Sequence, residues 1–427
     1  MRYYSLNNSS PLSSFKKAVQ NGIAPDRGLY FPEKITPISE DFINNINDYS
    51  NEEIAYEVIK QFIGDEIPTN ILKEIIKKTI SFDFPVVNLD DNIGSLELFH
   101  GPTMAFKDVG ARFMSQCLEY FNQNKNEEIT VLVATSGDTG GAVANGFLNA
   151  KGVQVVILYP KGKVSEIQEK QLTTLGNNIT ALEVDGVFDD CQEMVKSAFL
   201  DKNISRNLTS ANSINVARWL PQMFYFFFAY KQISKKYKDI IFSVPSGNFG
   251  NICAGLLAQK LGLPIKHFVA STNINDTVPK YLINGVYDPK PSKATISNAM
   301  DVGNPSNFIR IQELFNKNLS RLKKSFSSYS FSDDETKIMM KSIYDKFNYI
   351  SEPHGAIGYL GLKKHGLKTN EFGIFLETAH PVKFLDVVEE TLTVNVEIPP
   401  QIKEVMSKEK VSILISNYQD LKNFLNK

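Results

Sequence analysis

The stretches TVLVATSGDTGGAVA (130–144) and IIFSVPSGNFGNICA (240–254) share one local pattern, S-G-[D/N]-x-G, between a β-branched or apolar run and a helix-forming segment. A strand that leads through a glycine-rich loop into a helix is the repeating unit of parallel α/β sheets. In such sheets ligands bind at the carboxyl ends of the strands. We name the two loops the first glycine loop (136–140) and the second glycine loop (246–250), and we expect a binding site there.

Outward from these loops, strands and helices alternate along most of the chain, which predicts an α/β fold with helices on both faces of parallel sheets. The segment 214–233 is strongly apolar and predicts one long helix. Ser332 and Glu335 have the spacing of a capping box at the start of a later helix. The predicted strands are 85–89, 95–99, 129–135, 153–159, 179–184, 240–244, 267–270 and 372–376.

The two ends of the chain show a different pattern. Residues 1–92 contain mostly helical apolar stripes, one of them opened by the capping-box pair Ser50 and Glu53. This region predicts a helix-rich N-terminal domain. Residues 391–427 are polar and predict a helical tail.

The chemistry of both glycine loops favours anion binding. Glycine allows a positive φ that brings backbone N–H groups close to a ligand, and a helix N-terminus adds free donors and a favourable dipole. A tight turn with nothing bound would explain one such loop, whereas two matching loops at strand ends favour an anion site. Neither loop is a GxxxxGK[ST] or a GxGxxG motif, so a compact phosphate ester is favoured over a nucleotide.

Lys107 lies in the segment AFKDVG (105–110). A lysine next to an aspartate is in most cases a solvated surface pair. Here Phe106 and Val109 flank the pair, which indicates partial burial, and burial lowers a lysine pKa toward the neutral amine that Schiff-base chemistry requires. A phosphate-binding loop and such a lysine are the minimal set for pyridoxal phosphate (PLP), which supplies an electron sink. We therefore expect PLP as a Schiff base on Lys107.

Other polar side chains follow strands or precede helices. The Thr378 hydroxyl lies at a strand end, where it is either structural or a partner for the ring nitrogen of the cofactor. SANSINVAR (210–218) opens the long apolar helix, and Asn212 or Ser213 is most simply a helix cap. Arg218 lies about one and a half turns further on and can face a substrate anion, for which its forked guanidinium is suited.

Composition narrows the class of protein. A chain of 427 residues can bury large cores, and a formal net charge of -1 indicates neither a nucleic-acid binder nor a membrane-surface protein. Cys117, Cys191 and Cys253 are far apart and show no disulfide framework, which fits the cytoplasm. The N-terminus lacks a signal-peptide pattern, the apolar stretch 219–230 is too short for a membrane span, and the five histidines predict no metal site.

Seven motifs, taken together, resemble the threonine synthase family. Any one of them would indicate only the wider PLP fold-type II group, but the set is specific, and PDRGLYFP (25–32) and FIGDEIP (62–68) also resemble that family's N-terminal region. The motifs are FHGPTMAFKDVG (99–110), ATSGDTGGAVA (134–144), SANSINVAR (210–218), VPSGNFGN (244–251), SNAMDVGNPSN (297–307), SEPHGA (351–356) and ETAHPVKF (377–384).

The resemblance implies a fold and a set of residue roles. The fold is two α/β domains around PLP plus the N-terminal domain, with the catalytic region over 93–390 and a smaller domain inserted at about 110–205. At position 382, where the family commonly has a smaller residue, this chain has Val382. This difference changes the packing but removes no functional group. The cofactor-binding residues implied are Lys107, Asp138, Gly247, Asn248, Phe249, Gly250, Asn251 and Thr378. Those implied for the substrate are Thr135, Ser136 and Thr139 at its carboxylate and Asn212, Ser213 and Arg218 at its phosphate.

The reaction implied by the resemblance converts O-phospho-L-homoserine and water into L-threonine and phosphate. Lys107 would anchor the cofactor and carry protons. A serine or threonine dehydratase of the same fold-type is the main alternative, and a non-catalytic PLP-binding relative is another. The phosphate-binding set and the N-terminal domain favour the phosphorylated substrate. The sequence is compatible with a monomer or a homodimer.

Overall fold

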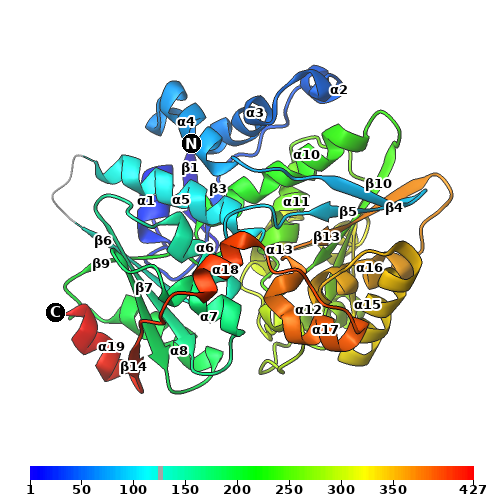
Figure 1. The fold of residues 1–427 in the computed structure, drawn as a ribbon. Helices are drawn as coiled ribbons and strands as arrows, with labels where there is room; N and C mark the ends of the chain where they lie inside the picture. The colour runs from blue at the N-terminus through cyan, green and yellow to red at the C-terminus, as the bar shows by residue number, and fades with distance from the viewer. Residues whose placement is uncertain (124–127) are drawn as a thin grey trace.

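The structure, a computed structural model, describes residues 1–123 and 128–427. Two largely parallel sheets lie side by side, one in each of two α/β domains, and the N-terminal helices lie above them (Figure 1). This is the two-domain α/β arrangement that the sequence predicted. Within the described residues, no helix is both long and apolar enough to cross a membrane.

The larger domain is built on a six-stranded sheet. Its strands are parallel except at the β4 edge. In order across the sheet they are β12 (Phe326–Ser330), β11 (His267–Thr272), β10 (Asp239–Pro245), β13 (Glu371–Glu377), β5 (Ile93–Glu97) and β4 (Val86–Asp90). Alternate side chains enter opposite layers: Phe242 and Phe268 pack toward α10 (Phe224–Ile233) and α11 (Gly250–Lys260), whereas Ile241 and Val269 pack toward α15 (Asp333–Phe347) and α16 (Pro353–His365).

The smaller domain is built on a five-stranded parallel sheet. In order its strands are β14 (Ile413–Ile415), β8 (Ile179–Val184), β7 (Val153–Pro160), β6 (Ile129–Ala134) and β9 (Asn207–Ser210). Val131 and Val133 face the main core, which includes residues of α5 (Lys107–Asn122) and α6 (Asp138–Gly146), and Leu132 faces α8 (Phe188–Leu200) and α19 (Tyr418–Leu425). A further helix, α7 (Glu166–Thr173), packs on α6.

The N-terminal region combines the predicted helices with strands that the sequence did not predict. A small antiparallel sheet has the order β2 (Ser13–Ser14), β1 (Arg2–Ser5), β3 (Tyr30–Pro32). Its helices are α1 (Phe15–Asn21), α2 (Glu40–Asn44), α3 (Asn51–Ile63) and α4 (Thr69–Thr79). The predicted capping box of Ser50 and Glu53 is present at the start of α3. These helices share one hydrophobic core with α5 and α10, so the N-terminal region is packed into the catalytic body.

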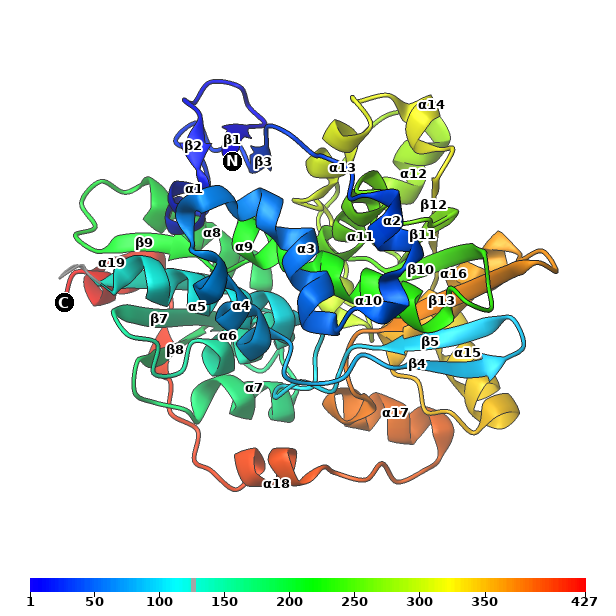
Figure 2. The same cartoon turned by 90° about the horizontal axis from the view of Figure 1, so that it is seen from above.

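The tail differs from the helical segment that the sequence predicted. After α17 (Leu385–Leu392) the chain runs along one side of the molecule from the larger to the smaller domain, through α18 (Pro400–Met406), and ends in α19 (Figure 2). Between α18 and α19, β14 adds a parallel strand to β8. The sequence did not predict this strand, because three residues are too few to show a strand period. The smaller domain therefore takes its β14 edge strand from the tail, and β9 lies just beyond the predicted insertion of about 110–205.

The predicted helix over 214–233 is interrupted. It consists of α9 (Val216–Trp219), a 3-10 turn (Leu220–Met223) and α10. Pro221 lies in the turn and has no N–H to donate, which explains the break. The remaining helices of the larger domain are α12 (Thr277–Asn284), α13 (Phe308–Leu314) and α14 (Leu319–Leu322).

Candidate active site

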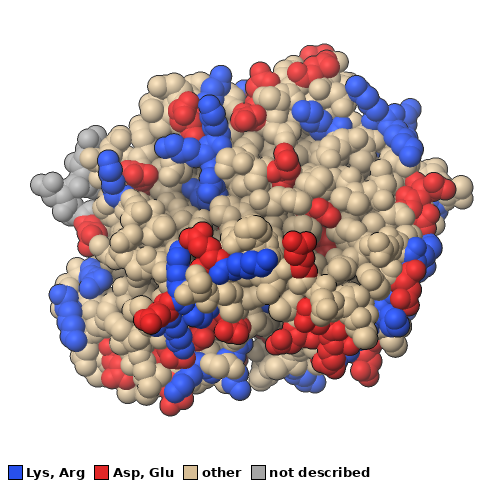
Figure 3. Space-filling view, in the orientation of Figure 1, with Lys and Arg blue, Asp and Glu red and all other residues tan. Residues whose placement is uncertain are grey.

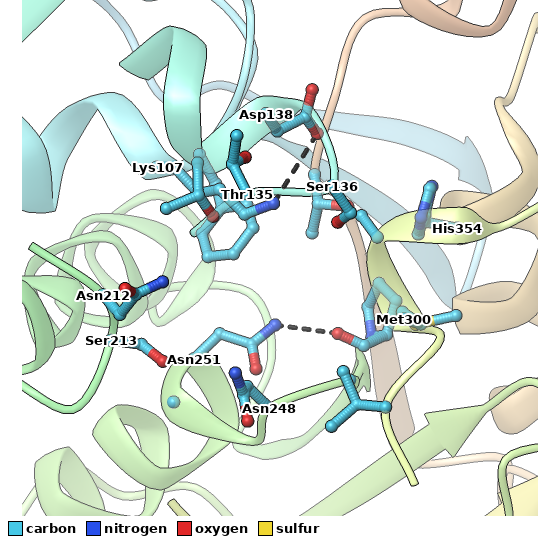
Figure 4. Close-up of a pocket in the computed structure, with 18 of the residues that line it drawn as sticks. Lys107, Thr135, Ser136, Asp138, Asn212, Ser213, Asn248, Asn251, Met300 and His354 are labelled. Carbon is cyan, nitrogen blue, oxygen red and sulfur yellow. Dashed lines mark hydrogen bonds and ion pairs between the residues drawn. The ribbon is translucent and has the colours of Figure 1, made fainter. Parts of the chain in front are cut away.

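A cavity opens where the carboxyl ends of β6 and β10 face each other (Figure 4). The cavity is lined by every site residue that the sequence predicted: Lys107, Thr135, Ser136, Asp138, Thr139, Asn212, Ser213, Arg218, Gly247, Asn248, Phe249, Gly250, Asn251 and Thr378.

Lys107 is the first residue of α5, and its side chain is 15% exposed. Its Nζ lies 3.8 Å from Asp138 Oδ2 and 5.5 Å from the centre of the Phe106 ring. Burial lowers the pKa of Lys107 below its ordinary value; Asp138 opposes this shift, while Lys383 and Arg218 reinforce it. The amine is therefore biased toward the neutral form, which is the form that attacks a carbonyl carbon.

The second glycine loop forms a tight turn at the N-terminus of α11. Phe249 has a left-handed backbone with φ 60°, which is uncommon for a bulky residue and is typical of functional sites. A Cβ at Gly247 would lie 2.8 Å from Met300 Cα, so glycine is required for the segment around Met300 to pack here. Asn251 Nδ2 donates to Pro245 O at 2.8 Å and fixes the turn. The first N–H groups of α11 lack partners within the helix and suit a phosphate.

The first glycine loop is organised by the Thr135 hydroxyl. It accepts hydrogen bonds from Gly137 N at 2.9 Å and Gly140 N at 2.8 Å, and it donates to Gly137 O at 3.1 Å. Because this hydroxyl is buried and already bonded within the loop, its observed contribution is the shape of the loop. Ser136 and Thr139 are half-buried at the cavity wall, where their predicted contact with a substrate carboxylate remains a prediction.

Asp138 is the first residue of α6 and is almost fully buried. Its Oδ1 accepts from Lys383 Nζ at 2.8 Å and from Gln168 Nε2 at 2.9 Å. Burial by itself would raise the pKa of Asp138, but the ammonium groups of Lys383 and Lys107 outweigh it, and the pKa lies well below its ordinary value. A fixed negative charge therefore stands beside Lys107.

Asn212 and Ser213 do not cap the helix that follows them. Asn215 caps α9 instead, since its side chain accepts a backbone N–H. Asn212 Nδ2 donates to Ala134 O at 3.0 Å, and Ser213 Oγ accepts from Asn307 Nδ2 at 3.0 Å. These bonds hold both side chains at the cavity wall, as Figure 4 shows, in positions that suit the predicted phosphate contact.

Arg218 is only 3% exposed and lines the same cavity. Its Nη1 donates to Ala211 O, which leaves Nη2 as the terminal donor able to reach a ligand. Burial lowers the pKa of Arg218 to about 10, and the distant Asp108 opposes this shift. The guanidinium therefore stays protonated near neutral pH and offers a buried positive charge.

Thr378 follows β13 and is held next to the segment that leads into Lys107. Its carbonyl accepts from Phe106 N at 2.9 Å, and Ala379 pairs with Ala105 in an isolated bridge. The Thr378 hydroxyl lines the cavity, where it can meet a ring nitrogen as predicted.

Sequence reasoning gave no role to two residues at this site. Lys383 is fully buried behind the cavity and pairs with Asp138. His354 lines the cavity; its Nδ1 lies 2.5 Å from Glu352 Oε2, and its buried Nε2 has no partner within the described residues. Both lie in quoted motifs, SEPHGA and ETAHPVKF, but their burial depends on contacts with distant segments.

Comparison with known proteins identifies the family. Models described as "Pyridoxal-phosphate dependent enzyme", "Threonine synthase N terminus" and "Threonine synthase, C-terminal" match residues 95–372, 2–80 and 355–425. The chain is 45% identical to the threonine synthase of Buchnera aphidicola subsp. Baizongia pistaciae, over 100% of this chain and 99% of that protein. The chain belongs to the threonine synthase family.

Solved threonine synthases have the same fold. The crystal structure from Escherichia coli superposes with a TM-score of 0.94 at 42% identity, covering 100% of this chain and 99% of that one. The PLP-bound threonine synthase from Brucella melitensis has a TM-score of 0.94 at 32% identity, with coverage of 100% and 99%. The predicted family and PLP fold-type II class are therefore confirmed, and the protein is a PLP-dependent enzyme.

The cavity of this threonine synthase family member fits the cofactor. Its amine at Lys107 matches the aldehyde of PLP, and the N-terminus of α11 matches the phosphate. Thr378 also lines the cavity, and its predicted contact with the pyridine nitrogen stays a prediction. Within the described ranges, no group of three or more His, Cys, Asp or Glu side chains is placed to hold a metal ion.

Proposed function

We propose that this protein converts O-phospho-L-homoserine and water into L-threonine and phosphate, the last step of threonine biosynthesis. The observation that carries the proposal is one cavity that combines Lys107 with two anion-binding regions. The second glycine loop would hold the cofactor phosphate, and Asn212, Ser213 and Arg218 would hold the substrate phosphate. Membership of the threonine synthase family supports both assignments.

The residues have distinct tasks in this reaction. Lys107 would hold the cofactor through its amine, and that amine, when free, would act as the base. Ser136 and Thr139 orient the substrate carboxylate. Arg218 orients the phosphate, so that the bonds to be broken at Cα, Cβ and Cγ are held in one geometry.

Bound PLP supplies the electron sink that stabilises negative charge on the substrate carbon atoms. Lys107 Nζ, biased toward its neutral form, takes the proton from Cα. A second proton leaves Cβ, the Cγ–O bond breaks, and phosphate departs with the bonding electrons. The oxygen of water then bonds to Cβ, and the proton that water loses goes to the departed phosphate. Protons return to Cα and to Cγ, which becomes the methyl group of threonine.

The proposal is tested by incubating the PLP-loaded protein with O-phospho-L-homoserine and measuring phosphate and threonine together. Equal amounts of both are expected. Phosphate without threonine would mean that water does not add at Cβ. Release of neither product by a protein that carries the lysine-linked cofactor would refute the proposal and favour a dehydratase. Lys107→Ala is the inactive control.

We further propose that the enzyme works in the cytoplasm, as a monomer or a homodimer, on a small substrate. Its three cysteines, Cys117, Cys191 and Cys253, are free and buried, which supports a reducing compartment. Basic and acidic side chains are interspersed on the face drawn in Figure 3, without the single-sign surface of a nucleic-acid binder. Light scattering on the purified protein would measure its mass in solution.

A further inference from the structure

Lys383 is a fully buried lysine that the reaction described above does not use. It lies in the 3-10 turn Pro381–Phe384, and its side chain has no exposed surface. Its Nζ donates to Thr103 O at 3.0 Å and lies 2.8 Å from Asp138 Oδ1. A buried amine is costly unless it is paired, and the contacts with Asp138 and Thr103 provide that pairing.

The two oxygens of Asp138 have different partners. Oδ1 is engaged by Lys383 at 2.8 Å and by Gln168 at 2.9 Å. Oδ2 faces Lys107 at 3.8 Å, beyond the length of a charge-assisted hydrogen bond. The carboxylate is therefore bonded to Lys383 and is only a near neighbour of Lys107.

The charged groups that face Lys107 are Asp138 on α6, Lys383 on the 3-10 turn, Arg218 on α9 and Glu352 at the start of α16. Asp138 and Glu352 favour the ammonium form of Lys107, whereas Lys383 and Arg218 disfavour it. Without Lys383, the nearest charge to Lys107 would be an Asp138 carboxylate with no other cation bonded to it. Opposite charges within about 4–6 Å shift a pKa by about 1–3 units, so the effect on the amine would be large.

We propose that Lys383 is a positioning residue that holds the Asp138 carboxylate away from a direct ion pair with Lys107, so that the Lys107 amine remains available as a base. The inference rests on the proposed role of Lys107. The alternative is that Lys383 only joins the 3-10 turn to the Thr103 segment through its backbone contact. The two explanations differ in whether the protonation of Lys107 changes when the charge of Lys383 is removed.

The test measures the protonation of Lys107 directly. The full-length protein without PLP is labelled with acetic anhydride in short pulses across a pH series, and acetylation of the peptide that contains Lys107 is quantified by mass spectrometry. The midpoint is the pH at which acetylation of Lys107 is half-maximal. It is compared between the wild-type protein and Lys383→Met, whose side chain has a similar length. Lys346→Met is the matched control, because Lys346 is an exposed lysine that pairs with Asp90 at 2.7 Å.

The midpoint for Lys107 is expected to rise by about one pH unit in Lys383→Met, which lowers its labelling about tenfold at pH values below the midpoint. Lys383→Arg should restore part of the shift, and Lys346→Met should leave the midpoint unchanged. A folded Lys383→Met protein with an unchanged midpoint would overturn the proposal. Because labelling needs no turnover, this outcome is separate from a failure to form threonine.

A second pair of variants covers the case in which Lys383→Met does not fold. Asp138→Asn removes the attraction and is expected to lower the midpoint for Lys107. Adding Lys383→Met to it leaves no carboxylate for residue 383 to hold, so the midpoint is expected to stay close to that of Asp138→Asn. A rise of about one pH unit in the double variant over Asp138→Asn would mean that Lys383 acts on Lys107 through its own charge and not through Asp138, and it would overturn the proposal.

Discussion

Replacing Arg218 by methionine is expected to lower kcat/KM for O-phospho-L-homoserine roughly 150-fold. Arg218 is 3% exposed, and its Nη1 is already bonded to Ala211 O, so Nη2 is the terminal donor left for a substrate anion. A hydrogen bond to a charged group contributes about 1.5–3 kcal/mol, and truncating one partner of a buried charge pair costs about 2–5 kcal/mol. A loss of about 3 kcal/mol corresponds to roughly 150-fold.

The assay separates substrate binding from cofactor binding. Initial rates of phosphate release give kcat and KM, and absorbance titration gives the affinity for PLP. We expect the loss mainly in KM, with the PLP affinity changed less than about threefold, since a threefold change is under 1 kcal/mol. Arg321→Met, at an exposed arginine of α14, is the matched control. A folded Arg218→Met protein with an unchanged KM would refute the assignment.

Three further outcomes follow from the site. Lys107→Ala should abolish turnover and the absorption band of the lysine-linked cofactor, and retained full activity would contradict its assignment. Thr378→Val should weaken PLP binding roughly tenfold by loss of about 1.4 kcal/mol, measured by absorbance titration. Thr391→Val is the control, because the buried hydroxyl of Thr391 has no partner in the described part of the chain. Equal affinities of Thr378→Val and the wild-type protein would contradict the ring-nitrogen contact. Burial raises the pKa of Asp108 to about 6 from 3.8, so the native state keeps a proton that the unfolded chain loses between about pH 4 and pH 6. The unfolding free energy of the wild-type protein, measured with urea, should therefore fall by about 3 kcal/mol relative to Asp108→Asn as the pH rises through this window, and a constant difference would contradict the raised pKa.

The parallel sheets and the position of the site were predictable because their signals are local. The β-branched runs at 129–135 and 153–159 form buried strands β6 and β7. The two glycine loops each lead from a strand into a helix, α6 and α11, as their pattern indicated. In each parallel sheet the carboxyl ends of the strands lie at one edge, which indicated these loops as binding sites. The packing of the two domains decides that the loops share one cavity, because β6 and β10 belong to different sheets.

Other features had no local signal. Strands β1, β2 and β3 contain four residues or fewer, and β14 contains three, so no strand period is visible in them. The three hydrogen bonds that the Thr135 hydroxyl makes within the loop were not predictable either, and its assignment to the substrate stays a prediction. The caps at Ser50 and Ser332 were predictable because each partner lies three residues away.

The sequence by itself determined the family and the α/β architecture, and it predicted a lysine for the cofactor and two loops for anions, since each is encoded in a short run of residues. Only the tertiary structure decided that Lys383 lies 2.8 Å from Asp138, that Nη1 of Arg218 is bonded to Ala211, and that the tail completes the smaller sheet. These contacts join residues that are not neighbours along the chain, and their energies depend on burial and on distances that only packing sets. Short runs of residues thus indicate the kind of chemistry, whereas the protonation of the reacting groups depends on contacts that the fold creates.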